Sequence, residues 1–296
     1  MRDGFGSFHP AVNFCYFIAV IALSMFTVHP VLLAVSLGAA LLYGVLLQGR
    51  EALRFALRVL LPMFVLCVAV NPLFNHRGVT VLGYFAGGNP LTLESLWYGA
   101  AAGGMLVCIL MWFHCYNIVM TSEKFIHLFG RVIPALSLVF SMVLRFVPRY
   151  RRQIGEIAAA RRCIGRDAGK GRLMERIRSG LSIVSIMTTW ALEHSIETAD
   201  SMRARGYGLP GRTSFGLWRF TRRDAALLAG IAVLTAATAA CMSTGLLSAR
   251  YFPAIQIGGS GVFSLLGMIG FALLCLIPPA AAVLEELQWN RSLSKI

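Results

Sequence analysis

The chain has 296 residues, of which 57% are hydrophobic and only 14% are charged, and its mean hydropathy is +0.70. This composition excludes an ordinary soluble domain and indicates a membrane protein. The formal net charge is +14, and most of it lies in residues 145–223, which hold 17 Lys and Arg against 6 Asp and Glu.

Apolar stretches of roughly 20 residues predict the membrane-spanning helices. Between the charged residues the sequence leaves about six such stretches, at Ala11–Val28, Val31–Leu47, Phe55–Phe74, Leu96–Met120, Ala225–Leu247 and Val262–Leu284. The first is interpreted as a membrane helix and not as a removable signal peptide, because no small-residue cleavage site follows it and a second apolar run comes directly after it.

The charges in the connections predict the orientation of the spans. Residues 48–58 contain three arginines and are expected in the cytoplasm, whereas residues 75–94 are nearly neutral and are expected outside. About six crossings then place both termini in the cytoplasm of a multi-pass protein of the prokaryotic plasma membrane.

The basic segment predicts helices on the cytoplasmic side, because an arginine at the centre of a bilayer costs at least about 2.5 kcal/mol. Thr121-Ser122-Glu123 has the pattern of a helix start. Pro134 begins a second, longer helix, and residues 172–205 predict a third that is too polar at both ends to span. We expect these helices to lie along the membrane, with one face on lipid or on other helices.

The predicted fold is therefore an all-α integral membrane protein with about six transmembrane helices and long cytoplasmic helices. Its three parts are an N-terminal membrane domain of about four spans (residues 1–120), a cytoplasmic or interfacial helical domain (residues 121–223) and a C-terminal segment of about two spans (residues 224–296). We expect no strands of note.

The basic segment lacks a nucleotide or nucleic-acid motif. Residues 165–171, GRDAGKG, fail the spacing of a phosphate-binding P-loop, because Gly171 follows Lys170 and no strand precedes them. They are interpreted as an exposed basic turn facing anionic headgroups. Nucleic acid is not an expected partner, since base-stacking aromatics and a docking module are both missing.

Metal binding and catalysis are not expected either. Glu193, His194, Glu197 and Asp200 lack the spacing of a zinc helix and are interpreted as an acidic patch that pairs with nearby arginines. The seven cysteines include no C-x-x-C pair. We therefore expect no metal, no cofactor and no catalytic residue.

Two polar residues interrupt the apolar stretches. Asn71 and His114 could contact a substrate. The favoured interpretation of both is a hydrogen bond between helices or a position near the end of a span.

The end of the third cytoplasmic helix is the clearest candidate for a functional site. In Ala204-Arg205-Gly206 a small residue allows close approach, the arginine offers five donors in a rigid fork, and the glycine ends the helix. Such a tip suits a groove on another protein, where the guanidinium finds carboxylates or helix carbonyls. An ordinary capped helix end at the membrane surface explains the same residues equally well.

Two stretches resemble the transmembrane T component of energy-coupling factor (ECF) transporters, the EcfT/CbiQ family. They are TSEKFIHLFGRVIPALSLVFSMVLRFVPRYRRQIGEIAAARR at residues 121–162 and SMRARGYG at residues 201–208, which matches the second Ala-Arg-Gly motif of that family. NPLFNHRG at residues 71–78 is a weaker match, and the resemblance covers roughly residues 71–208.

The first arginine motif departs from the family pattern, which is also Ala-Arg-Gly. This chain offers either Ala160-Arg161-Arg162 or, three residues later, Cys163-Ile164-Gly165-Arg166. The resemblance thus leaves Arg161, Arg162 and Arg166 as alternatives for the first contact. A divergent partner ATPase, or a paralogue with altered coupling, also stays open.

The resemblance implies a non-catalytic scaffold that couples two ABC-type ATPases to a substrate-binding S component in the membrane, for uptake of a vitamin or a metal ion. Each arginine motif would sit in a groove of one ATPase, and the apolar helix faces would hold the S component. The alternatives are a self-sufficient secondary transporter or channel, which calls for intramembrane charges or inverted repeats, and a membrane-embedded enzyme, which calls for a paired acid and base or a metal set.

Overall fold

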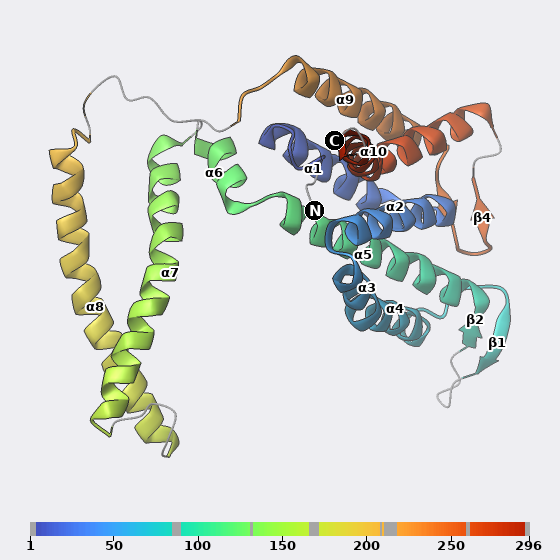
Figure 1. Cartoon of the computed structure of the whole chain (residues 1–296). Coiled ribbons are helices and arrows are strands. Elements are labelled where there is room, and N and C mark those ends of the chain that lie inside the picture. Colours follow the sequence, from blue (N-terminus) through green and yellow to red (C-terminus); the bar gives the residue numbers. More distant parts are fainter. Residues whose placement is uncertain are drawn as a thin grey trace. The chain divides into compact units, whose positions relative to one another are not determined.

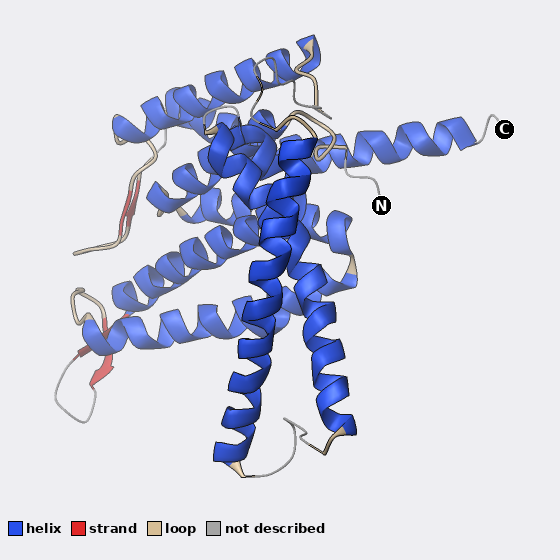
Figure 2. Ribbon diagram, turned by 90° about the vertical axis from the view of Figure 1, so that its left-hand side faces the viewer, coloured by secondary structure: helices blue, strands red, loops and turns tan. Residues whose placement is uncertain are grey.

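The computed structural model describes residues 4–84, 90–130, 133–165, 172–207, 209, 218–258 and 261–293. Helices dominate these residues, and the strands are limited to two short hairpins (Figures 1 and 2). The predicted all-α membrane class is confirmed.

Each predicted apolar stretch coincides with an apolar helix. The first two are α1 (Pro10–Phe26) and α2 (Pro30–Gln48). The next span is one continuous helix made of α3 (Arg50–Phe55), the π-helical η1 (Ala56–Leu60) and α4 (Leu61–Phe74). The last three are α5 (Leu93–Val119), α9 (Arg222–Ser243) and α10 (Val262–Leu293). Among the described residues five helices are long and apolar enough to cross a membrane: Pro30–Gln48, Arg50–Phe74, Leu93–Val119, Arg222–Ser243 and Val262–Leu287. The remaining one, α1, is shorter, at 17 residues.

The contacts divide the chain into two compact units. Unit 1 comprises residues 1–125 and 218–296, and unit 2 comprises residues 126–217. In unit 1, α10 packs on α2 and α9, and α1 packs on α5 and α9. The first and last segments of the chain thus share one core, whereas the three-part division drawn along the sequence stays a prediction.

An aromatic cluster forms the centre of unit 1. Phe5, Tyr16, Phe17, Tyr43 and Trp112 are fully buried. Their rings meet edge to face, with centroids 5.0 Å apart for Phe5 and Tyr16 and 6.0 Å apart for Tyr16 and Trp112. Edge-to-face contacts add to the stabilisation that burial of these large rings provides.

Buried polar side chains join the helices around this cluster. Ser36 on α2 accepts hydrogen bonds from Trp112 Nε1 at 2.9 Å and Cys108 Sγ at 3.0 Å, both on α5. Its hydroxyl also lies 3.3 Å from that of Ser24 on α1. A polar group inside a membrane protein needs such partners, because lipid supplies none.

The predicted interhelical roles of Asn71 and His114 are confirmed. The hydroxyl of Ser95 on α5 donates to Asn71 Oδ1 on α4 at 3.3 Å. His114 Nε2 lies 3.0 Å from Gln48 Oε1, and the imidazole stacks on the ring of Phe55 at 4.3 Å.

Two antiparallel hairpins follow α4 and α9, so the prediction of no strands was wrong here. They pair β1 (Val81–Tyr84) with β2 (Pro90–Thr92), and β3 (Ala249–Arg250) with β4 (Gln256–Ile257). Strands of two to four residues are too short for an alternating pattern to be recognised. The buried Glu94 supports the first hairpin, since its carboxylate accepts hydrogen bonds from Thr80 N at 3.1 Å and Thr80 Oγ1 at 2.8 Å.

The basic segment forms α6 (Ser122–Gly130), α7 (Pro134–Cys163) and α8 (Leu173–Ala204). The predicted helix starts at Thr121-Ser122 and Pro134 and the predicted helix end beside Arg205 are confirmed. Most of unit 2 is the pair α7 and α8, which run in opposite directions and contact each other (Figure 1).

Candidate functional site: the ends of the α7–α8 helix pair

Two sets of side chains hold α7 and α8 together. In the first, the ring of Tyr150 on α7 meets the ring of Trp190 on α8 edge on, with centroids 5.6 Å apart. The guanidinium of Arg149 lies 5.5 Å from the Trp190 ring centre and bonds to His194 Nε2. His194 in turn bonds through Nδ1 to a Glu197 carboxylate oxygen at 2.8 Å.

This first set of contacts includes part of the predicted acidic patch. His194 and Glu197 connect to an arginine, as expected, but the connection runs through the imidazole of His194 and not directly from carboxylate to guanidinium. No group of metal-binding side chains is found in the part of the chain that the structure describes.

Arg161 provides the second set of contacts. Its guanidinium reaches from α7 to α8 and donates to the hydroxyl of Ser182 and, at 3.5 Å, to that of Ser179. The side chain is half-buried, and its Nε is buried without a hydrogen-bond partner. Arg161 is therefore engaged within the helix pair, a role that the sequence alone did not indicate.

The end of α8 has the geometry of a Schellman motif. Ala204 is the last helical residue, Arg205 is the C-cap, and Gly206 follows with a φ of 78°. The Gly206 N–H donates to Arg203 O and the Tyr207 N–H donates to Met202 O, both at 3.0 Å. These two bonds satisfy carbonyls that would otherwise lack a partner. They require a left-handed backbone conformation at residue 206, which only glycine adopts without strain. Arg205 is exposed at this rigid end.

The end of α7 shares the left-handed glycine and one of the two hydrogen bonds of this geometry. Cys163 is the last helical residue, Ile164 is the C-cap, and Gly165 has a φ of 77°. The Gly165 N–H donates to Arg162 O at 3.0 Å. Arg162 is exposed, whereas Arg166 lies outside the described residues.

The predicted site residues are therefore not all in one place. Ala204, Arg205 and Gly206 form one end, and Arg162 and Gly165 belong to the other. Because α7 and α8 are antiparallel and Arg161 meets Ser182, the α8 tip lies roughly 30 Å along the helix from that contact, at 1.5 Å per residue. The two ends are thus well separated within unit 2, as two distinct contact points require.

The helix pair also exposes large apolar side chains. On α7 they include Val139, Phe140, Val143, Leu144, Val147 and Ile154, and on α8 they include Ile177, Leu181, Val184, Ile186, Leu192 and Ile196. An exposed apolar surface of this extent is typical of an interaction site or of contact with lipid.

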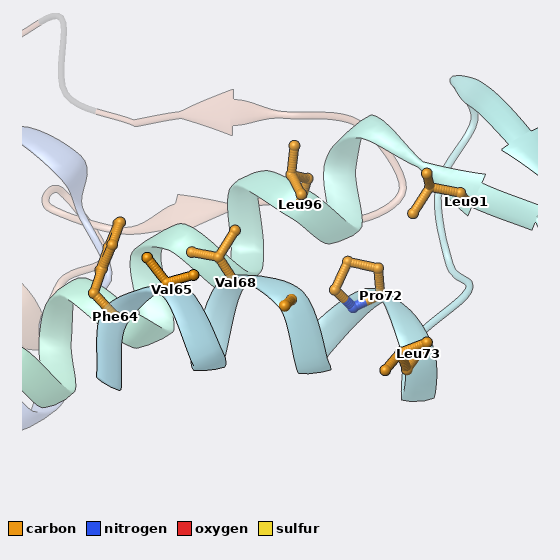
Figure 3. A pocket seen from close by; sticks show the side chains of 8 residues that line it. Phe64, Val65, Val68, Pro72, Leu73, Leu91 and Leu96 are labelled. Carbon is orange, nitrogen blue, oxygen red and sulfur yellow. The ribbon is translucent and has the colours of Figure 1, made fainter. Parts of the chain in front are cut away.

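Unit 1 contains a separate apolar groove of about 400 Å³ (Figure 3). It lies between α4, β2 and the start of α5, and its lining consists of Phe64, Val65, Val68, Ala69, Pro72, Leu73, Leu91 and Leu96. This lining offers no charged or hydrogen-bonding side chain for a polar substrate, so the groove is not the candidate site.

Comparison with known proteins supports the resemblance to the T component of ECF transporters. The chain is similar to three energy-coupling factor transporter transmembrane proteins EcfT. The one from Listeria innocua is 28% identical over 206 residues, which are 64% of this chain and 76% of that protein. The one from Lacticaseibacillus paracasei is 33% identical over 104 residues, which are 35% of this chain and 39% of that protein. The one from Bacillus subtilis is 30% identical over 102 residues, or 34% and 38% of the two chains.

No protein-family model matches the chain. The similarity to the Lacticaseibacillus and Bacillus proteins spans about two fifths of their length, and the similarity to the Listeria protein spans about three quarters. With the apolar helices, these relatives indicate a multi-pass protein of the bacterial plasma membrane. Several EcfT proteins at about 30% identity, one of them matched over 64% of this chain, support the resemblance to the transmembrane T component of energy-coupling factor transporters.

Proposed function

We propose that this chain is the coupling subunit of an ECF-type importer, with both termini in the cytoplasm. Two ABC-type ATPases contact the ends of α7 and α8, and a substrate-binding S component in the membrane rests on the exposed apolar faces of the two helices. The single observation that carries the proposal is the rigid end of α8, which holds an exposed Arg205 between a small residue and a left-handed glycine.

The chemistry of Arg205 suits contact with a protein groove. A guanidinium offers five donors in a fixed plane and keeps its charge, so it binds carboxylates and helix carbonyls more specifically than a lysine does. The two hydrogen bonds that close the α8 end fix the backbone that carries it. A force applied to Arg205 is therefore transmitted to the helix and not absorbed by a loose terminus.

At the α7 end, Arg162, Gly165 and Arg166 remain the candidates for the contact with the second ATPase. Arg161 is the least suited of the predicted arginines, since its guanidinium already bonds to Ser179 and Ser182.

Motion of the two helix ends explains how a chain without catalytic residues takes part in transport. The partner ATPases hydrolyse ATP, and their closure draws the separated ends of α7 and α8 toward each other. The contact between Tyr150 and Trp190 lies between those ends and serves as the pivot, whereas Arg161 joins α7 to α8 near the α7 end. Repacking of the apolar faces then moves the S component, which selects the cargo, a vitamin or a metal ion.

Recovery of the ATPases with this chain tests the proposal. Arg205→Glu reverses the charge at the tip, and we expect it to lower ATPase recovery from detergent-solubilised membranes at least about tenfold, or about 1.4 kcal/mol. Arg203→Glu is the matched control, because it makes the same charge change in an exposed position of the same helical turn. Full recovery of the ATPases with Arg205→Glu would contradict the proposal.

A further inference from the structure

Three arginines form a row at one end of the span made of α3, η1 and α4. Arg50, Arg54 and Arg58 follow one another at a spacing of four residues, and all three are exposed. Side chains four residues apart are neighbours on a helix surface. Within the described part of the chain, no hydrogen bond or ion pair engages these guanidiniums. The arginine row is therefore available to a partner outside the chain.

The π-helical η1 keeps the arginine row on one face of the helix. On an ideal α-helix, positions eight residues apart differ by about 80°. The i→i+5 bonds of a π-helix place more residues in each turn, which offsets this rotation. Ala52 and Leu60 are eight residues apart and are both buried, with exposures of 0% and 2%. Arg54 follows Ala52 by two residues, or about 200° of rotation, so the row faces away from the rest of unit 1.

A row of exposed leucines runs beside the arginine row. Leu53, Leu57 and Leu61 are 51%, 56% and 55% exposed and are also four residues apart. Consecutive residues are separated by about 100° around the helix, so the leucine row borders the arginine row. The two rows match the anionic phosphate and the apolar acyl chain of a phospholipid. An acidic protein surface would pair with the arginines but would not need the leucines.

The length of the span places both rows at the boundary between headgroups and acyl chains. The helix Arg50–Phe74 has 25 residues, or about 37 Å, and the hydrocarbon core is about 30 Å thick. The helix is apolar up to Phe74, so the excess of about 7 Å lies at the arginine end. Arg50 and Arg54 then lie in the headgroup layer, and Arg58 lies about 5 Å inside the core, from where its long side chain reaches the phosphates.

We propose that the arginine row and the leucine row together bind one anionic phospholipid. The headgroup phosphate binds to Arg54 and Arg58, because a guanidinium pairs with phosphate through two parallel hydrogen bonds. One acyl chain lies along the leucine row. The proposal goes beyond the coupling role, since it concerns unit 1 and involves no contact with an ATPase.

Lipid titration of the full-length chain tests the proposal. Phosphatidylglycerol is added to the detergent-solubilised protein, and its Kd is measured by native mass spectrometry, with phosphatidylcholine as the zwitterionic comparison. Arg54→Gln and Arg58→Gln are each expected to raise the Kd of phosphatidylglycerol about fivefold, or about 1 kcal/mol. The Kd of phosphatidylcholine should change less than about twofold, because its choline offsets the phosphate charge.

Matched variants separate a built site from general attraction to anionic lipid. Arg222→Gln removes an exposed arginine at the start of another span, α9, and should leave the Kd of phosphatidylglycerol within about twofold. Leu57→Asn should raise that Kd several-fold, whereas Leu57→Met should not, because it keeps an apolar surface of similar volume. All of these side chains are exposed, so the variants are expected to fold normally, which thermal melting checks.

Three outcomes would overturn the proposal while leaving the coupling role in place. Equal weakening by Arg222→Gln would show attraction between a basic protein and anionic lipid without a site. Displacement of the lipid by inorganic phosphate, or unchanged binding by Leu57→Asn, would assign the arginine row to a free anion. Unchanged lipid binding by the arginine variants, with loss of a protein from the complex recovered from native membranes, would assign the row to an acidic protein partner.

Discussion

At the scale of single residues, the arginines of the basic segment differ by their surroundings and not by their type. Arg161 reaches across to α8 and is half-buried, whereas Arg205 is exposed beyond the last turn of α8. A guanidinium that is already bonded to two hydroxyls holds helices together, and one that faces outward is available to a partner. The arginines therefore divide into one that stabilises the helix pair and one that we propose as a contact for another protein.

Removal of Arg161 is expected to loosen the α7–α8 contact. Arg161→Met keeps most of the length of the side chain but loses the hydrogen bonds to Ser179 and Ser182. Bonds from a charged group contribute about 1.5–3 kcal/mol when buried, and this half-buried group is expected at the low end. Hydrogen exchange should become faster in residues 155–163 and 176–186. Arg152→Met, at an exposed position of the same helix, is the control, and equal exchange in both variants would contradict the assignment.

The buried imidazole of His29 is expected to make the stability of unit 1 depend on pH. It is the N-cap residue of α2 and is 1% exposed, and burial lowers the pKa of its imidazole below the usual value of about 6.5. As pH falls below about 6.5 the unfolded chain binds a proton that the folded chain does not bind, so the stability present above that pH is progressively lost. The melting temperature at pH 5 and 7.5 should therefore differ more for the wild type than for His29→Gln. Equal differences would show that His29 is not the group responsible.

At the scale of elements, the helix ends position the candidate site. Their glycines adopt φ values that other residues adopt only with strain, and the resulting hydrogen bonds stop α7 and α8 at defined residues. Local sequence controls this geometry, which is why the end of α8 was predictable. The end of α7 was not, because the sequence near Arg161 allowed two registers.

Gly206→Ala is expected to disorder the end of α8. The added Cβ lies in a backbone conformation unsuited to alanine and 3.1 Å from Leu209 Cδ1. The strain is about 1 kcal/mol, and it should reduce ATPase recovery by several-fold although Arg205 is unchanged. Gly180→Ala is the matched control on the same helix, because its added Cβ meets no atom within 4 Å and it favours the helix by about 1 kcal/mol. A loss of recovery with Gly180→Ala of the same size would show that the effect is not specific to the tip.

At the scale of the whole molecule, segments far apart in the sequence form unit 1. The hydroxyl of Tyr16 on α1 donates to Leu274 O on α10 at 3.1 Å, and Asp224 at the start of α9 accepts from His9 N at 3.1 Å. Unit 2, residues 126–217, lies between these two parts in the sequence and forms a compact unit of its own. The first and last segments of the chain together complete the core of unit 1. The α7–α8 pair belongs to the other unit, and such a division suits a part that moves.

The sequence by itself determined the class of the protein, the helices and one end of the site. Apolar runs bounded by charges must become helices in a membrane, because backbone groups in lipid need partners within the same segment. Ala204-Arg205-Gly206 was recognisable because helix capping depends on adjacent residues. Only the tertiary structure decided that Arg161 bonds to Ser179 and Ser182, that Ile164 is the C-cap of α7, and that the first and last helices of unit 1 share one core. These facts depend on which residues meet across helices, and interactions between helices leave no regular spacing along a single chain.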